Sequence, residues 1–213
     1  MTRAAQSQSG PLLAHSVAPE ELTFDEFLEW ADEDTHAEWV NGKVVFMSPV
    51  SREHARVKKF LVKLLDYFVE LHALGEIYDE PFQMKTGTNL PGRSPDIIFV
   101  AHENLGRLKD NYLDGPADLA VEVISPESRG RDRGEKFYEY EEGGVKEYWL
   151  IDPPRMQAEF HQLGPDRYFH LMALEPDGRF RSAVVPGFSM KVGWLWQRPL
   201  PTLPQVLREW SLS

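Results

Sequence analysis

The most extended hydrophobic pattern in the chain has the spacing of an α-helix. After Ser51, apolar residues recur at intervals of three and four, and they form one stripe of a helix of about five turns. The stripe consists of Val57, Phe60, Leu61, Leu64, Leu65 and Phe68. A shorter helix is expected from residue 24, because Thr23 is a suitable N-cap and Glu26 completes a capping box. A last helix is expected over 203–211.

Other segments have the pattern of β-strands. Two short apolar runs flank Asn41-Gly42, a dipeptide that favours a hairpin because both turn positions need positive φ. One short helix, over 130–144, interrupts the later strands, and Gly143-Gly144 is a natural stop for it. Apolar or alternating residues typical of strands occupy the runs 76–86, 95–100, 118–125, 146–152, 157–163, 167–174, 179–185 and 188–192.

This order of elements predicts one α/β domain, rich in helix early and in strand late. Its expected bounds are 20–213, and residues 1–19 are expected to be a flexible N-terminal tail. The tail has one arginine and no sustained apolar stretch, so it does not resemble a signal peptide. No apolar run approaches the roughly 20 residues of a membrane helix. We therefore expect a cytoplasmic protein without a membrane partner.

The amino-acid composition and the charge limit the kinds of site that the chain can form. The 213 residues include no cysteine, which excludes disulfides and thiolate metal sites. The formal net charge of −11 opposes binding to a polyanion, but nine acidic residues lie between residues 20 and 38, and −11 + 9 leaves −2 for the rest. The acidity is therefore local, and a nucleic-acid surface elsewhere on the chain stays compatible with the sequence.

Basic residues gather in two places. Arg52, Arg56, Lys59 and Lys63 form a second stripe on the predicted long helix, beside the apolar one. This stripe is either an ordinary solvated face or a surface that lies against phosphates. Arg129, Arg131 and Arg133 precede or begin the helix expected over 130–144, and they are suited either to phosphate contact or to a mobile charged loop.

Two acidic residues occupy positions where a strand is expected to be buried. Glu122 lies within the apolar run 118–125, and Asp96 begins the run 95–100 directly after Pro95. Burial of an unpaired carboxylate costs on the order of several kcal/mol. A divalent ion shared by the two carboxylates would offset this cost, and Mg²⁺ is the ion that such oxygen ligands suit. Alternatively, Glu122 pairs with a buried Arg or Lys and Asp96 caps a turn.

The segments "SPDIIFV" and "DLAVEVISPESRGRDRGEKFYEYEEGGVKEYWLIDP" resemble the Uma-two family of restriction-endonuclease-like proteins, in the PD-(D/E)xK nuclease superfamily. The resemblance extends upstream to "EWVNGKVVFMSPVSREH" and covers about residues 38 to 153. It implies a restriction-endonuclease-like core, in which helices flank a mixed central β-sheet. The later strands then form additional C-terminal antiparallel strands.

The resemblance also implies a set of site residues. Asp96 and Glu122 match the two motif acids and are implied metal ligands, together with the backbone carbonyl of Val123. The motif lysine is expected two residues after Glu122, where this chain has Ile124. Lys136 matches the lysine that this branch takes from the following helix. Asp132, four residues before Lys136, is expected on the same helix face.

Two further residues of this region are weaker candidates. Glu38, at the start of the Asn-Gly hairpin, could add a carboxylate to the metal site. His54 begins the long helix near its apolar stripe, so it is expected to point inward. It is either a group that supports the site or contacts substrate, or a core histidine.

Together these features predict an endonuclease that hydrolyses DNA phosphodiester bonds with Mg²⁺, for which Mn²⁺ can substitute. The implied catalytic residues are Asp96, Glu122 and Lys136. By analogy with the superfamily, a homodimer is expected. Ile124 and the net charge favour an alternative, a catalytically inactive nuclease fold that serves as a nucleic-acid-binding or protein-interaction module. Nothing in the sequence suggests the carboxylate pair of a glycosidase.

Overall fold

The structure is a computed structural model that describes residues 21–32 and 35–212. The tail expected over 1–19 lies outside these residues, and the single-domain boundary at residue 20 stays a prediction. The helices are α1 (Phe24–Trp30), α2 (Arg52–Leu71), α3 (Arg129–Asp132), α4 (Glu135–Gly143) and α5 (Leu203–Glu209), with 3-10 helices η1 (His102–Arg107), η2 (Pro153–Arg155) and η3 (Val192–Trp196).

The strands of the described residues form three sheets. The six-stranded sheet has the order β11-β10-β9-β8-β6-β3, the five-stranded sheet the order β2-β1-β5-β4-β7, and β12 pairs with β13. The strands are β1 (Ala37–Val40), β2 (Lys43–Phe46), β3 (Gly75–Asp79), β4 (Gln83–Lys85), β5 (Gly92–Arg93), β6 (Ile97–Ala101), β7 (Tyr112–Asp114), β8 (Leu119–Val123), β9 (Glu147–Asp152), β10 (Gln157–Leu163), β11 (Phe169–Leu171), β12 (Arg179–Arg181) and β13 (Ser189–Lys191).

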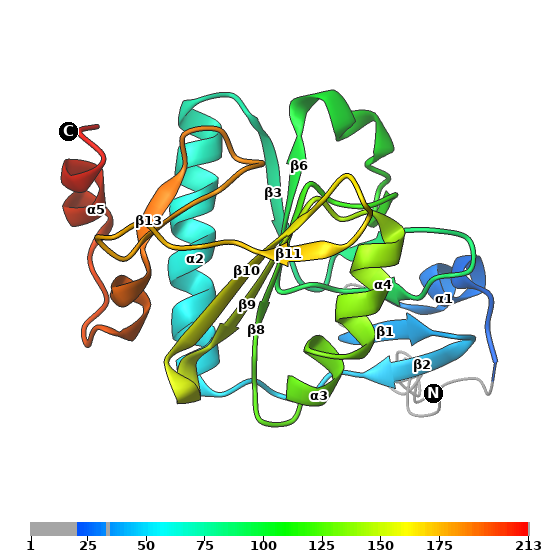
Figure 1. The fold of residues 1–213 in the computed structure, drawn as a ribbon. Helices are drawn as coiled ribbons and strands as arrows, with labels where there is room; N and C mark the ends of the chain where they lie inside the picture. Colours follow the sequence, from blue (N-terminus) through cyan, green and yellow to red (C-terminus); the bar gives the residue numbers. More distant parts are fainter. Residues whose placement is uncertain (1–20, 33–34, 213) are drawn as a thin grey trace, which may run out of the picture.

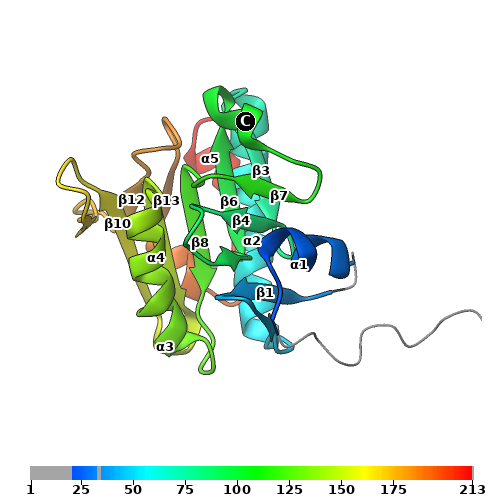
Figure 2. The same ribbon diagram turned by 90° about the vertical axis from the view of Figure 1, so that its right-hand side faces the viewer.

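The six-stranded sheet is the centre of the molecule and confirms the predicted mixed sheet between helices. Strands β8 and β9 are parallel, and the other pairs in this sheet are antiparallel. Helix α2 covers one face of this sheet and α4 the other (Figures 1 and 2). The additional C-terminal antiparallel strands are also present as β12 and β13.

Alternation along the strands decides which side chain meets which helix. In β8, Leu119, Val121 and Val123 belong to the core cluster that includes α2, whereas Ala120, and Ile124 directly after the strand, belong to the cluster that includes Tyr140 of α4. Successive side chains of a strand point to opposite faces, so Glu122 points toward α4. The sheet therefore directs this carboxylate to the helix that carries Lys136.

The sequence predictions for the first elements are confirmed. The Thr23 hydroxyl accepts a hydrogen bond from the Glu26 N–H at 3.2 Å, and the Glu26 carboxylate accepts one from the Thr23 N–H at 2.8 Å. Asn41 and Gly42 have φ values of 50° and 84° in the turn between β1 and β2. Helix α2 begins after Ser51 and buries the expected apolar stripe against the central sheet.

The helix expected over 130–144 is in fact two helices, α3 and α4, and this prediction was wrong. The break is at Gly134, where an added Cβ would lie 2.7 Å from the Gly130 carbonyl oxygen. Because only glycine permits this close approach, the backbone turns there, and Asp132 and Lys136 lie on different helices. Gly144, with φ of 88°, ends α4 as predicted.

Two strands of the structure were not expected from the sequence. β5 lies in the segment taken as a Gly/Pro/Asn turn, and β7 lies in the polar loop 101–117. Both belong to the five-stranded sheet, which is separate from the central sheet. They have only two and three residues, too few for a hydrophobic period to show in the sequence.

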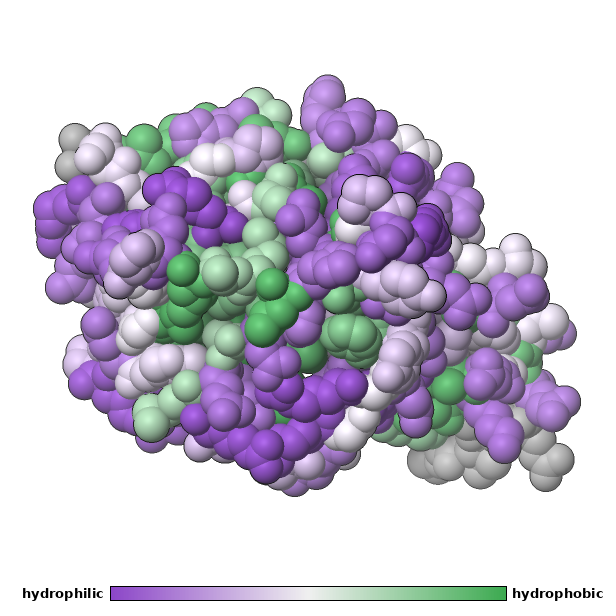
Figure 3. All heavy atoms as spheres, viewed as in Figure 1, coloured by the Kyte–Doolittle hydropathy of each residue, from purple (hydrophilic) through white to green (hydrophobic). Residues whose placement is uncertain are grey.

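The outer surface is mainly polar. Figure 3 shows a largely hydrophilic face with hydrophobic side chains near its centre. Leu171, in the edge strand β11, is 67% exposed. The expected homodimer stays a prediction.

We expect Gly134→Ala to lower the free energy of unfolding by about 1–3 kcal/mol, since the new methyl group would press on the Gly130 carbonyl. Urea denaturation measures this change. Gly130→Ala is the matched control, because an added Cβ there has nothing within 4 Å. Equal losses in the two variants would contradict a packing constraint at the α3–α4 junction.

Candidate active site

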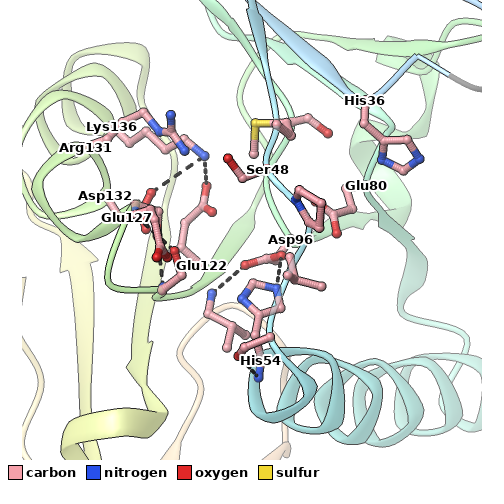
Figure 4. A pocket seen from close by; sticks show the side chains of 18 of the residues that line it. His36, Ser48, His54, Glu80, Asp96, Glu122, Glu127, Arg131, Asp132 and Lys136 are labelled. Carbon is pink, nitrogen blue, oxygen red and sulfur yellow. Dashed lines mark hydrogen bonds and ion pairs between the residues drawn. The ribbon is translucent and has the colours of Figure 1, made fainter.

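A pocket of about 570 Å³ opens where β6, β8, α2 and α3–α4 meet, and the β2–α2 loop lies along its side (Figure 4). Among the described residues that line it are five carboxylates and two cationic side chains. These are Glu80, Asp96, Glu122, Glu127 and Asp132, with Arg131 and Lys136. The pocket thus gathers more negative than positive charge inside a partly enclosed space.

The Lys136 ammonium lies at the inner wall of the pocket, and the side chain is only 1% exposed. Its Nζ is 2.8 Å from a Glu122 carboxylate oxygen, 2.9 Å from a Glu38 carboxylate oxygen and 3.8 Å from Oδ1 of Asp132. The Tyr140 hydroxyl donates a second hydrogen bond to Glu122 at 3.0 Å. Groups of the protein therefore contact the buried Glu122, and a buried lysine pairs with it as the ion-pair alternative expects.

The structure explains how the site has a lysine although Ile124 occupies the motif position. Ile124 lies on the same sheet face as Glu122 and is buried in the apolar cluster with Tyr140. The break at Gly134 starts α4 beside this cluster, and Lys136 is in the first turn of that helix. An ammonium group therefore reaches Glu122 from the helix instead of the strand.

Arg93 forms an ion pair with Glu38 and fixes its position. Arg93 Nη1 donates to a Glu38 oxygen at 2.9 Å, while its Nε and Nη2 donate to Glu139 of α4 at 2.7 Å and 2.8 Å. Arg93 is 1% exposed and Glu38 is fully buried. The fork geometry of a guanidinium favours such a two-sided contact. As a result, Glu38 is tied into an ion-pair network with Lys136, and its role as a metal ligand stays a prediction.

Asp96 is fixed by two donors at the other side of the pocket. One carboxylate oxygen accepts the Val123 N–H at 2.6 Å, and the other is 2.9 Å from Nε2 of His54. His54 is 6% exposed and points inward, as the helix periodicity predicts. It contacts a motif acid directly, and its role as a supporting group of the site or as a hydrogen-bonded core histidine stays a prediction. The carbonyl of Val123 as a metal ligand stays a prediction.

The buried groups have strongly shifted pKa values. For Glu38, burial alone would raise the pKa, but Lys136 and Arg93 outweigh it and lower the pKa to about 2. For Glu122, burial and the nearby carboxylates Asp132, Asp96 and Glu38 raise the pKa well above its usual value despite Lys136. Burial also opposes the charge of Lys136, yet Glu122 and Glu38 raise its pKa above the ordinary value. Lys136 is therefore a permanent cation in this site.

Two residues of the pocket and its ion-pair network were not identified from the sequence. Glu80, in the turn after β3, lines the pocket near His54 and Asp96, and Arg93 organises Glu38. Glu80 follows Asp79 in a polar turn, and Arg93 lies in a turn-like Gly/Pro segment. Neither has a local pattern that distinguishes it from a surface charge, so their roles depend on contacts between distant segments.

The predicted phosphate-binding residues do not all reach the pocket. Arg131 lines it, whereas Arg129 pairs with Asp152 at 3.2 Å and Arg133 pairs with Glu159. Arg56 pairs with Glu53. The predicted basic stripe of α2 lies along the outer side of the helix and consists of Arg52, Arg56, Lys59 and Lys63. Two of these residues, Arg52 and Arg56, line a different groove.

Residues 24–193 match the Uma2 family, described as "Putative restriction endonuclease". A crystal structure described as a putative nuclease belonging to DUF820, from Anabaena variabilis ATCC 29413, has a similar fold. The TM-score is 0.66 at 18% sequence identity, and the similarity covers 82% of this chain and 97% of that chain. No curated protein sequence matches the chain. In the described residues, no helix is long and apolar enough to cross a membrane.

The Glu38 network predicts a specific dependence of stability on pH. The pKa of Glu38 is lowered in the folded protein from 4.5 to about 2, so its ionised form stabilises the fold above pH 4.5. This contribution is lost as the pH falls through that interval, and it amounts to about 3 kcal/mol. We expect wild type to exceed Glu38→Gln in free energy of unfolding by about this amount at pH 7 and by little near pH 2.

The control for this pH series is Glu135→Gln, which removes an exposed partner of the same Arg93. It should change the free energy of unfolding by less than about 0.5 kcal/mol. A wild-type advantage over Glu38→Gln that is constant from pH 7 to pH 2 would show that the charge of Glu38 does not stabilise the fold.

Proposed function

The chain belongs to the Uma2 family, and we propose that its acidic pocket is the catalytic centre of a divalent-metal-dependent endonuclease that hydrolyses DNA phosphodiester bonds. The observation that carries this proposal is the buried Lys136 ammonium beside Glu122, in the same pocket as Asp96. Two acids that can hold a metal ion, and a lysine that can stabilise developing negative charge, are groups suited to metal-assisted phosphodiester hydrolysis.

The pocket residues fit a divalent ion. The five lining carboxylates exceed the two lining cations, and Oδ1 of the buried Asp132 has no hydrogen-bond partner. Asp96 and Glu122, with the Val123 carbonyl, would hold Mg²⁺, and Mn²⁺ could replace it. When bound, the ion supplies charge balance at the phosphate and acidifies a water molecule. Binding would also favour the ionised form of Glu122, whose pKa burial raises.

Lys136 acts in this proposal as a charged hydrogen-bond donor. Its raised pKa keeps it protonated, so it cannot take a proton from water as a general base. It can orient the attacking water or donate to a phosphate oxygen as negative charge develops. Glu38, held by Arg93, keeps the ammonium aimed into the pocket. We therefore assign Glu38 to the positioning of Lys136, and Asp132 to the same cluster.

In this proposal, Arg131 contacts the DNA substrate, because it is the arginine that lines the pocket. Arg129 and Arg133, which are paired with Asp152 and Glu159, would hold the α3 segment in place. The exposed basic groups of α2 would contact more distant phosphates. A homodimer would let such a centre act on both strands, by analogy with related nucleases.

A second candidate function is a catalytically inactive nuclease fold that binds nucleic acid or protein. The observations that favour it are the Lys136 and Tyr140 contacts that already satisfy Glu122, and the ion pairs that occupy Arg129 and Arg133. Such a protein would bind without cleavage, so a DNA-nicking assay separates the two functions.

We expect purified wild type to nick supercoiled plasmid with Mg²⁺ or Mn²⁺, and EDTA to abolish nicking. Asp96→Asn, Glu122→Gln and Lys136→Met should each reduce the rate by about 100-fold or more, since each removes a group that balances charge in the reaction. Gel electrophoresis of the plasmid over time measures the rate.

The matched control is Glu127→Gln, which alters an exposed carboxylate of the same pocket. It should retain nicking within a few-fold of wild type. Nicking that survives Glu122→Gln would point to a contaminant or to another site. Tight DNA binding without nicking, in all variants and metals, would favour the inactive module.

Arg131→Gln should weaken DNA binding and reduce the slope of log Kd against log salt by about 1, because one phosphate contact is lost. Fluorescence anisotropy at several salt concentrations measures the slope. Lys59→Gln and Lys63→Gln test the outer face of α2 in the same way. If Arg131→Gln leaves the slope unchanged while the lysine variants lower it, the substrate lies along α2 and not across the pocket.

A further inference from the structure

A second groove, of about 630 Å³, lies between the first turns of α2 and the segment that joins η3 to α5. Figure 1 shows this segment beside the N-terminal half of α2. The described residues that line the groove are Arg52, Glu53, Arg56, Arg198, Pro199 and Leu200. Three of these side chains are cationic and one is anionic, so the lining has a net charge of 3 − 1 = +2.

Ion pairs and hydrogen bonds connect the two sides of the groove. Arg198 Nη1 donates to both carboxylate oxygens of Glu53, at 2.8 Å and 2.7 Å. Arg56 donates from Nε to the same carboxylate at 3.2 Å and from Nη1 to the Gln197 carbonyl at 3.0 Å. The Arg198 side chain is nevertheless 64% exposed. A guanidinium has five N–H donors, so Arg198 keeps donors for a ligand after it binds Glu53.

The positive charge of the groove continues along α2. Arg52, Lys59 and Lys63 are exposed, and within the described part of the chain none of the three has an ion-pair partner. From residue 52 to residue 63 the helix rises by about 16 Å. A row of separate positive charges over this length matches a chain of phosphates better than a single carboxylate or free phosphate.

The groove and the acidic pocket share the start of α2. His54 lines the pocket, whereas Arg52, about 200° away around the helix, lines the groove. An α-helix is about 10 Å wide, and one DNA strand has a phosphate about every 3.4 Å along the duplex axis. A strand that crosses the end of α2 from the pocket would therefore reach the groove after about three nucleotides.

We propose that Arg52, Arg56 and Arg198 bind the phosphate backbone of the DNA flank that extends from the pocket across the start of α2. This inference rests on the proposed function for the position of the pocket on the DNA, but binding in the groove does not require cleavage. Arg198 lies outside residues 24–193, which match the Uma2 family. The contact therefore belongs to the C-terminal segment of this chain and is not implied by the family match.

The first measurement is the salt dependence of duplex DNA binding to the full-length protein in EDTA, by fluorescence anisotropy. Arg198→Gln should reduce the slope of log Kd against log salt by about 1, because one phosphate contact is lost. The matched control is Arg181→Gln, which alters an arginine that is 59% exposed, also pairs with a carboxylate, and lines neither the pocket nor the groove. It should leave the slope unchanged.

Glu53→Gln supplies a variant that gains binding. Loss of this carboxylate raises the charge of the groove lining from +2 to +3 and frees Arg198, so DNA should bind more tightly and the slope should increase by about 1. This gain cannot come from a failure to fold. Circular dichroism checks the fold of Arg198→Gln.

A tethered reagent locates the DNA flank directly. The chain has no cysteine, so Arg198→Cys introduces a single thiol to which iron–EDTA can be attached. With ascorbate and peroxide, the attached iron generates hydroxyl radicals and should cut end-labelled DNA that lies in the groove. The same reagent on Arg181→Cys should cut no faster than the unattached reagent.

Two results would overturn the DNA flank contact. One is a salt slope that neither Arg198→Gln nor Glu53→Gln alters, and the other is tethered cleavage from Arg198→Cys that does not exceed the Arg181→Cys control. Failure of the proposed function gives a different result: the groove variants change DNA binding and the tethered iron cuts the DNA, but the wild type nicks no plasmid with any metal.

Discussion

The buried ammonium of Lys136 is the constraint on which the arrangement of this protein depends. Removal of such a group from water costs several kcal/mol, and only close carboxylates offset that cost. Here one carboxylate comes from β8 and another from β1, so the ammonium joins the central sheet, the smaller sheet and α4 at one point. Arg93 extends the same network from β5 to Glu139 of α4. The relative positions of these elements therefore depend on these ion pairs as well as on hydrophobic packing.

The same network gives chemically similar acids different properties. Glu38 lies between two cations and has its pKa lowered to about 2, whereas Glu122 shares one cation with several acids and has its pKa raised. The first is thus a fixed negative charge that holds Lys136. The second is a carboxylate whose ionisation would favour a cation in the pocket. This division is compatible with a structural ion pair next to the proposed metal site.

The sequence alone predicts the parts of this account that are local. The hydrophobic spacing of residues 57–68 predicts α2, and the Asn41-Gly42 turn predicts the first hairpin. The resemblance to nuclease motifs identifies Asp96, Glu122 and Lys136 as neighbours, and the structure brings Glu122 and Lys136 into contact. The single helix over 130–144 was wrong because its break depends on a close approach of Gly134 to Gly130, which helix periodicity does not encode.

The interactions that complete the site are not local and could not be predicted in this way. Arg93 is 55 residues from Glu38, and nothing in its turn-like segment distinguishes it from a solvated arginine. Glu80 resembles any acid in a polar turn until β3 pairs with β6 and brings it near Asp96. Both roles depend on strand pairings between segments that are far apart in the chain.

The most direct test of the central claim, that this pocket is a metal-dependent centre, is a crystal structure of the wild type grown with Mn²⁺ and measured at an anomalous wavelength. We predict an anomalous peak inside the pocket at about 2.1 Å from a carboxylate oxygen of Asp96, with Lys136 still bound to Glu38. A map in which the manganese peaks lie only on the outer surface, and the Asp96 carboxylate contacts none of them, would contradict the account.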